Sequence, residues 1–398
     1  MATVNPLPSA ESASVRTDTR LLVLLASLPQ EKLSSVLDKL ASCIPPEDLL
    51  IATSDETAKT VRPDLQIVTA SSSKSTWTVT AADYATAYEL AQQHNAGAVL
   101  LLGPECDSLS LEGLRNLTGT IVSTGSDLVM PRYDLPPRAG LVNSAILYPL
   151  SRALFVSLAR FPLAVDFGLS MRLAERLYAA SQRLIKLNQS SALLWPVNEA
   201  ATAGLIIREA DAGHRALPQP AEPDLNTILP LIAGSLFADI EAKAAFWQRA
   251  RQLAGNLNHH AGTRGPSPDG ATDIAPMLQA FRLAYTNLQE IWSLVLPPNT
   301  LLGLKRLSLT DGPAFRMPES LWARIIYDFV LAYRLRTINR GHLLGALIPL
   351  YLAWVASHIN ITASEADPEQ HVEAVAAAFA SEKPYFVARW RWPDRFNP

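Results

Sequence analysis

The spacing of hydrophobic residues changes near residue 216, and this change divides the chain into two regions. Before it, short apolar runs alternate with stretches of helical spacing. The pattern predicts strands over residues 21–25, 49–52, 98–102, 128–132 and 205–210, and helices over 30–41, 81–94 and 111–117. Strands that alternate with helices are typical of an α/β domain with a largely parallel sheet.

After a Pro-rich joint over residues 216–223, the spacing is helical throughout. The expected helices cover residues 224–254, 275–294, 319–337, 341–359 and 365–381. Asp224 is placed to cap the first of them. We therefore predict an α/β domain over 19–215 and an all-α domain over 224–382.

The two ends of the chain differ from these regions. Residues 1–18 are rich in Pro, Ser and Thr and hold too little apolar surface to fold, so they are expected to form a disordered tail. Residues 383–398 combine Trp, Tyr and Phe with Arg and Lys. Docking of this aromatic and basic tail on the helices is preferred over a membrane-surface or nucleic-acid patch.

Composition narrows the class of protein. The chain has 398 residues, of which 48% are hydrophobic, and a net charge of −3, so no basic field recruits nucleic acid. Two cysteines are too few for a disulfide framework, which favours a reducing, cytoplasmic location. The longest apolar run, 343–359, contains Pro349, Ser357 and His358, so a buried helix is expected rather than a membrane span.

The most informative chemistry lies between Asn143 and Leu177. A predicted helix carries YPLSRAL at residues 148–154, and a predicted loop over 165–170, VDFGLS, leads into a second helix with Ser170 as N-cap. The open end of such a helix attracts phosphate or carboxylate. An ordinary turn between two helices is the alternative.

The YPLSRAL and DFGLS pair resembles bacterial sugar-nucleotide glycosyltransferases of the GT-A fold, in particular the glucosyl-3-phosphoglycerate synthase and mannosylglycerate synthase group. The resemblance is strong over about 120–177, diffuse over 21–119 and 195–247, and faint beyond. It implies a GT-A-like (Rossmann-like), mixed and mostly parallel sheet followed by an all-α domain. It also implies transfer of a sugar from a nucleotide-sugar donor to a small hydroxy-acid acceptor.

The resemblance further implies a divalent metal, Mg²⁺ or Mn²⁺, on an acidic D-x-D pair after the strand 98–102. Gly103 and Glu105 stand at the two acid positions, and Asp107 restores an E-x-D spacing in a shifted register. The family's third ligand, a histidine, matches Leu217, with His214 three residues earlier. Glu105, Asp107 and His214 are thus the candidate metal ligands, since such ions prefer hard donors. A solvated acidic turn is the alternative.

Other candidate residues follow from the same match. Asp55, directly after the second predicted strand, would hold the base or ribose and share one donor site with Glu105 and Asp107. Gly140 and Asn143, in the acceptor segment, would hold the acceptor together with Arg152.

Two acids are candidates for catalysis. Glu199 lies beside Asn198, which replaces the acid of the family's W-x-x-D-I-W, and Asp166 begins the DFGLS motif. Arg152 could neutralise a buried Asp166 or hold the carboxylate of an acceptor.

Several matched positions have lost the family's chemistry. Ala82 stands where the family has a lysine that grips the diphosphate, and the neighbouring Asp83 would repel it. Two classes of function stay open: an active transferase, and a non-catalytic relative that binds a ligand or a partner enzyme. A homo-oligomer is compatible with both.

Overall fold

The computed structural model describes residues 20–26, 28–71, 75–218, 224–250, 273–364 and 366–393. Its first part is a seven-stranded sheet of order β3-β2-β1-β4-β6-β5-β7, in which only β6 runs antiparallel to its neighbours. The strands are β1 Leu21–Leu25, β2 Leu49–Thr53, β3 Gln66–Thr69, β4 Ala98–Leu102, β5 Leu128–Asp134, β6 Asp166–Ser170 and β7 Ile207–His214.

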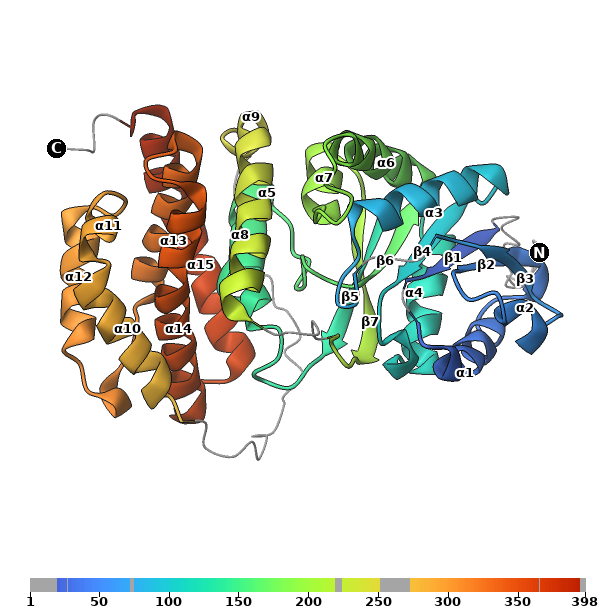
Figure 1. The fold of residues 1–398 in the computed structure, drawn as a ribbon, viewed down its shortest axis with the longest axis horizontal. Coiled ribbons are helices and arrows are strands. Elements are labelled where there is room, and N and C mark those ends of the chain that lie inside the picture. The colour runs from blue at the N-terminus through green and yellow to red at the C-terminus, as the bar shows by residue number, and fades with distance from the viewer. Residues whose placement is uncertain are drawn as a thin grey trace, which may run out of the picture.

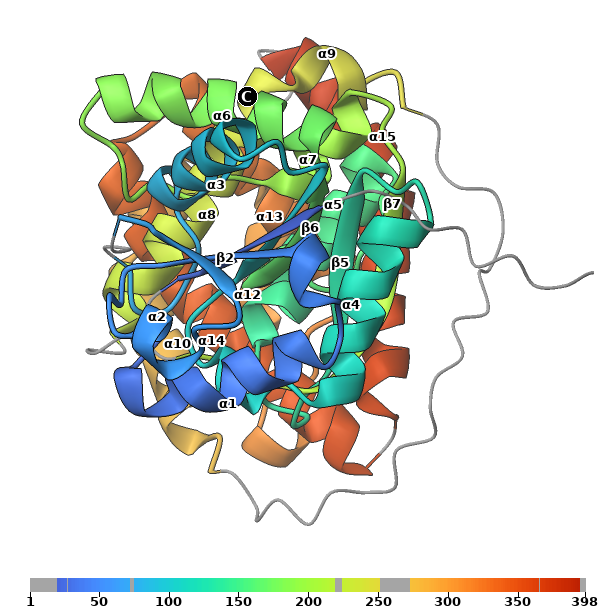
Figure 2. The ribbon, with the colours of Figure 1, turned by 90° about the vertical axis from the view of Figure 1, so that its right-hand side faces the viewer.

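Helices cover both faces of this sheet. In Figures 1 and 2, α1 (Gln30–Ala41) and α4 (Leu111–Ser123) lie on one face, and α3 (Ala81–Gln93) and α6 (Met171–Lys186) lie on the other. The central strands are fully buried as a result, which explains why β1, β2 and β4 are continuous apolar runs rather than alternating ones. Short helices α2 (Ala58–Val61) and α7 (Pro196–Thr202) complete this part.

The second part is a layer of helices. It contains α8 Leu225–Ala242, α9 Ala244–Trp247, α10 Ala275–Asn287, α11 Gln289–Ser293, α12 Pro298–Ser308, α13 Glu319–Leu335, α14 Arg340–Ser364 and α15 Pro368–Arg391. Four tryptophans, Trp247, Trp292, Trp322 and Trp354, are at most 1% exposed in its core. By length and composition α8 and α14 could cross a membrane, but 72% of the apolar stretch of α14 is buried, against 39% for α8.

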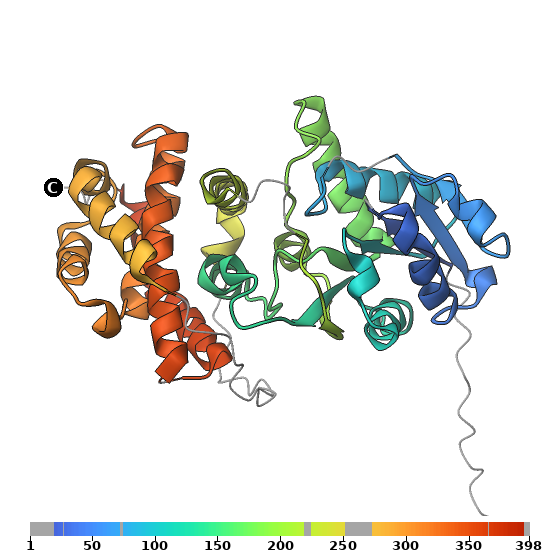
Figure 3. The same ribbon diagram turned by 60° about the horizontal axis from the view of Figure 1, so that its bottom comes forward.

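The helix that carries YPLSRAL belongs to this helical core although it precedes the joint. It is α5 (Tyr148–Phe155), which continues a π-helical turn over Asn143–Leu147. Seven apolar residues of this segment, from Ala145 to Phe155, pack into the core of the helical layer, and the Trp322 indole donates a hydrogen bond to the Ala145 carbonyl at 2.7 Å. Figures 1 and 3 show α5 and α8 between the sheet and the helices α10 to α14 of the second part. The division into domains at residues 216–223 stays a prediction.

The fold class predicted from the sequence, a mixed and mostly parallel sheet followed by helices, is confirmed. The five predicted strands are present, although the last begins at Ile207 and runs to His214. Ser170 caps α6 and Asp224 caps α8, as expected. The sequence did not indicate α2, β3, α7 or α12. The helices predicted over 224–254 and 275–294 are interrupted at Lys243 and Leu288. The predicted tail over 1–18 lies outside the described residues.

Two further predictions of local structure were wrong. Residues 166–170 form the strand β6 rather than a loop, because they are hydrogen-bonded between β4 and β5. Gly168 fits there because a Cβ would lie only 3.0 Å from the side chains of Ile121 and Val129. The last helix does not end near residue 381 but continues to Arg391, with Phe386 and Trp390 buried. Most of the aromatic and basic tail is therefore part of α15.

Candidate functional site

The carboxyl ends of β1, β2 and β4 meet at one edge of the sheet, because these three strands are parallel. In open α/β sheets this edge is where ligands bind. Asp55 follows β2, Glu105 and Asp107 follow β4, and α1 follows β1. The sequence thus places its donor-site candidates after strands that end at a common edge.

Asp55 has a local structural role in this arrangement. Its Oδ1 accepts hydrogen bonds from the backbone N–H of Thr57 at 2.8 Å and from the Thr57 hydroxyl at 2.7 Å. The Gln30 amide, in the first turn of α1, donates to the same Thr57 hydroxyl at 3.2 Å. Asp55 therefore fixes the turn that leads into α2, and this turn contacts the beginning of α1.

Lys32 of α1 pairs with the two acidic side chains that follow β4, Glu105 and Asp107. The Lys32 ammonium donates to Glu105 Oε2 at 2.7 Å and lies 3.2 Å from Asp107 Oδ2. Hydrogen bonds to Glu105 and Asp107 raise the pKa of Lys32 above its usual value, so the ammonium stays charged. Both candidate metal-binding carboxylates thus already have a cation between them.

Asp166 forms the centre of a buried network next to these acids. Its carboxylate pairs with Arg215, with Nε 2.9 Å from Oδ2, and neither side chain is exposed. The Tyr133 hydroxyl donates to Asp166 at 2.7 Å and the Gly103 amide at 3.1 Å. Burial, and then the Asp166 charge, raise the pKa of Tyr133 well above its usual value, so the phenol keeps its proton.

This network corrects one interpretation of the sequence. Arg152 does not neutralise Asp166; Arg215 does, directly after β7. Arg215 was not among the residues singled out in the sequence, although it lies between His214 and Leu217, the two positions considered for the family's histidine. A buried acid in a central strand requires a cation, and this is the signal that could have pointed to Arg215.

Arg215 also ties the end of β7 to the loop after β4. Its guanidinium donates to the carbonyls of Pro104 at 2.7 Å and of Glu105, and to the Ser108 hydroxyl at 3.1 Å. His214, the candidate third metal ligand, is exposed at the end of β7. The turn that carries Glu105 and Asp107 is therefore fixed by side chains from α1 and from the end of β7.

Gly103 shows why the first acid of the family pattern is missing. A Cβ at this position would lie 2.5 Å from the Val165 carbonyl oxygen and 2.8 Å from the Val165 Cβ. Backbone at this distance cannot move aside easily, so no side chain fits. An acid at position 103 is incompatible with this packing of β4 against the segment before β6.

Asp83, which stands at the family's diphosphate-gripping segment, has a structural role too. The Thr80 amide and hydroxyl both donate to its carboxylate, at 2.8 Å and 2.7 Å, and form a capping box at the start of α3. The Asp83 carboxylate thus already accepts two hydrogen bonds at the N-terminus of α3.

The acceptor candidates also make internal contacts. Arg152 forms an ion pair with Glu373 of α15, and the Tyr148 hydroxyl donates to the same carboxylate at 2.7 Å. Both polar atoms of the Asn143 amide bond to the backbone of Leu163, at 3.1 Å and 3.3 Å. Gly140 has φ +66°, a conformation that favours glycine. These residues join α5 and its preceding turn to their neighbours.

Glu199 belongs to a separate polar cluster around α7. It pairs with Arg176 at 2.8 Å and with Lys243 at 3.3 Å. The adjacent Asn198, fully buried, donates to Asp239 at 2.9 Å. No hydrogen bond or ion pair described for Glu199 connects it to the acids after β4, and two cations already neutralise it.

The residues present do not fit a resident Mg²⁺ or Mn²⁺. Within the described part of the chain, no group of three or more His, Cys, Asp or Glu side chains is arranged to hold a metal ion. Glu105 and Asp107 are paired with Lys32, and His214 does not complete a set with them.

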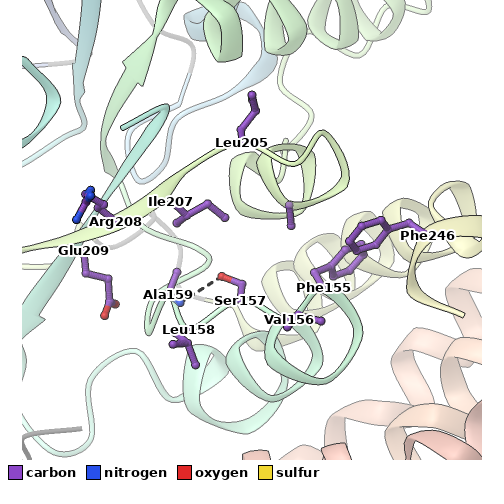
Figure 4. Close-up of a pocket in the computed structure, with 11 residues that line it drawn as sticks. Phe155, Val156, Ser157, Leu158, Ala159, Leu205, Ile207, Arg208, Glu209 and Phe246 are labelled. Atoms are coloured by element: carbon purple, nitrogen blue, oxygen red, sulfur yellow. Dashed lines mark hydrogen bonds between the residues drawn. The ribbon is translucent and has the colours of Figure 1, made fainter. Parts of the chain in front are cut away.

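A cavity of about 500 Å³ lies between β7, α5, α7 and α9. In Figure 4, Phe155 and Phe246 stack at one end, while Arg208 and Glu209 lie at the opposite end. Val156 in its wall has φ +59°, which is unusual for a β-branched residue and marks local strain. The cavity has the size of many small-molecule sites.

Comparison with known proteins gives the following picture. No protein-family model matches the sequence, and no curated protein matches it. Among solved structures, the chain is similar to glucosyl-3-phosphoglycerate synthase from Mycobacterium tuberculosis in several complexes. With Mn²⁺, UDP and glucosyl-3-phosphoglycerate, the identity is 14%, the TM-score is 0.35, and the match covers 56% of this chain and 80% of that one.

Two further complexes of the same synthase give comparable values. With Mn²⁺, UDP-glucose and phosphoglyceric acid, the identity is 14%, the TM-score is 0.36, and the coverage is 64% of this chain and 89% of that one. With UDP, the values are 12% and 0.36, with coverage of 56% and 79%. At TM-scores of this size, function has to be inferred from the residues of this chain.

Proposed function

We propose that this chain is a glycosyltransferase-like protein that does not carry out metal-dependent sugar transfer and acts by binding a small ligand. The observation that carries the proposal is the Lys32 ammonium, which lies 2.7 Å from the Glu105 carboxylate and 3.2 Å from that of Asp107. Sugar transfer needs groups that bind and neutralise the leaving diphosphate. In this chain the two acids that would hold a metal for that purpose are already paired with Lys32.

The positions matched to the family support the same conclusion. Gly103 has no room for an acid, Ala82 replaces the lysine that grips the diphosphate, and Leu217 replaces the histidine ligand. Loss of one such electrostatic contact commonly costs about 100-fold in rate, although effects within one site are not additive. Three losses together leave little of the machinery for stabilising a departing diphosphate.

The cavity next to β7 supports the binding part of the proposal. Its volume of about 500 Å³ lies within the range of small-molecule sites, and its walls combine Phe155, Phe246 and Ile207 with Arg208 and Glu209 at the opposite end. Such a mixture suits a ligand with an apolar body and a polar end. The cytoplasmic location, the absence of nucleic-acid binding and any homo-oligomer remain predictions from the sequence.

Incubation with nucleotide sugars tests the proposal. UDP-glucose and phosphoglycerate, which the M. tuberculosis synthase binds, come first, followed by GDP- and ADP-sugars and glycerate, each with Mn²⁺ or Mg²⁺. We expect no sugar transfer above background. Turnover of about 1 per second or faster, abolished in Glu105→Ala but retained in the exposed control Glu290→Ala, would contradict the proposal. A thermal-shift panel of UDP, GDP and their sugars, with and without Mn²⁺, tests binding in parallel.

A further inference from the structure

We propose that Lys32 takes the place of the divalent cation at the carboxyl edge, so that the loop carrying Glu105 and Asp107 is held by a lysine instead of a metal. The inference deepens the proposed function and rests on it, because a site closed by its own lysine explains why metal-dependent transfer is absent. It concerns metal binding, which can be measured without any sugar transfer.

The first support is where the ammonium lies. It is placed between the two carboxylates that the E-x-D spacing brings together, at 2.7 Å from one and 3.2 Å from the other. Two carboxylates and one cation are also what a minimal hard-metal site consists of. A divalent ion entering here would meet the ammonium at short range and would have to displace it.

The second support is the way in which α1 holds the loop. Lys39 lies two turns after Lys32 on the same helix, and its ammonium donates to the carbonyls of Asp107 and Leu109, both at 2.7 Å. The helix is anchored by buried Leu33 and Val36, among other residues of its apolar face. One helix thus presents one lysine to the carboxylates of the loop and a second lysine to its backbone.

The two lysines differ in a way that provides a matched control. Lys39 binds backbone carbonyls, so its removal loosens the loop but uncovers no carboxylate. Removal of Lys32 leaves Glu105 and Asp107 without their shared cation, while Lys39 and Arg215 still hold the backbone of the loop. The side chain of Lys32 is 34% exposed, so its replacement leaves no buried hole.

Binding of Mn²⁺, followed by the electron paramagnetic resonance signal of the free ion, tests the inference on the full chain. We expect Lys32→Met and Lys32→Gln to bind one Mn²⁺ at least tenfold more tightly than the wild type. The gain should disappear in Lys32→Met/Glu105→Gln, and Lys39→Met should behave like the wild type. Circular dichroism and thermal unfolding verify that every variant is folded.

The inference is overturned if the wild type binds Mn²⁺ as tightly as the Lys32 variants, or if the folded variants gain no affinity. It is also overturned if Lys39→Met gains as much as Lys32→Met, because the effect would then come from a loosened loop. Sugar transfer by the wild type would contradict the proposed function without changing these affinities. The two failures can therefore be told apart.

Discussion

Asp166 and Arg215 form an ion pair of 2.9 Å in which neither side chain is exposed, although 49 residues separate them in the sequence. Burying two charges costs free energy that the pair recovers only when the remaining polar atoms are satisfied. Here the Tyr133 hydroxyl and the Gly103 amide donate hydrogen bonds to the Asp166 carboxylate. The Arg215 guanidinium in turn donates to the Pro104 carbonyl. The pair therefore stabilises the carboxyl edge of the sheet, and its two buried charges neutralise each other rather than face a substrate.

Removing one partner of this pair should destabilise the protein strongly. In Arg215→Met the Asp166 carboxylate would stay buried without its cation, and we expect the free energy of unfolding to fall by about 3–5 kcal/mol. Urea denaturation measures this change. Arg324→Met is the matched control, because the Arg324 side chain is 45% exposed and its pair with Glu382 should contribute about 0–1 kcal/mol. Equal losses in the two variants would contradict the assigned role of Arg215.

The sequence predicted most of the elements because their signals are local. Buried runs such as 98–102 identified strands, and Ser170 identified the start of α6. The strand β6 was missed because Asp166 and Gly168 resemble loop residues. Their presence in a strand is explained only by tertiary contacts, namely Arg215 for the acid and the close packing of Ile121 for the glycine.

The partners of the candidate residues could not be predicted for the same reason. Lys32 is 73 residues from Glu105, and Glu373 is 221 residues from Arg152. The spacing of the acids drew attention to Glu105 and Asp107 after β4, but it gave no indication of the lysine that pairs with both. A local motif shows which chemical groups are present, whereas the fold decides whether they are free to act.

The close approach at Gly103 gives a second prediction. Gly103→Ala places a methyl group 2.5 Å from the Val165 carbonyl oxygen, so the backbone must shift, and we expect a loss of about 1–3 kcal/mol. Gly119→Ala is the control, because Gly119 lies in the middle of α4 with nothing within 4 Å of an added Cβ. That variant should be up to about 1 kcal/mol more stable than the wild type. Urea unfolding of both variants decides the matter, and a neutral Gly103→Ala would refute the steric account.

The last prediction concerns pH and a pair of histidines in the helical layer. His358 and His371 face each other with their Nδ1 atoms 2.7 Å apart, and both side chains are buried. One ring must donate and the other accept, so the contact holds a single proton between the two Nδ1 atoms. Burial, followed by the nearby His371 and Arg160, lowers the pKa of His358 from 6.5 to about 3, against a smaller opposing effect of Glu369.

The direction of the pH dependence follows from the pKa of His358 in the folded and in the unfolded protein. Below pH 6.5 the unfolded chain takes up a proton at His358 that the folded protein refuses until about pH 3. The contribution of His358 to stability is therefore complete above pH 6.5 and is lost as the pH falls, by at most about 1.4 kcal/mol per pH unit. Asp328 acts in the opposite direction, because burial raises its pKa to about 7 and favours folding as the pH falls.

A variant separates these two contributions. His358→Gln removes the titrating ring and leaves Asp328 unchanged, so the difference in unfolding free energy between wild type and variant reports the His358–His371 pair without the contribution of Asp328. We expect the wild type to be the more stable at pH 7.5 and this advantage to shrink by about 2 kcal/mol at pH 5. Urea denaturation at the two pH values measures it. A difference that stays constant between pH 7.5 and pH 5 would show that the folded protein accepts the proton, and that the buried pair does not exclude it.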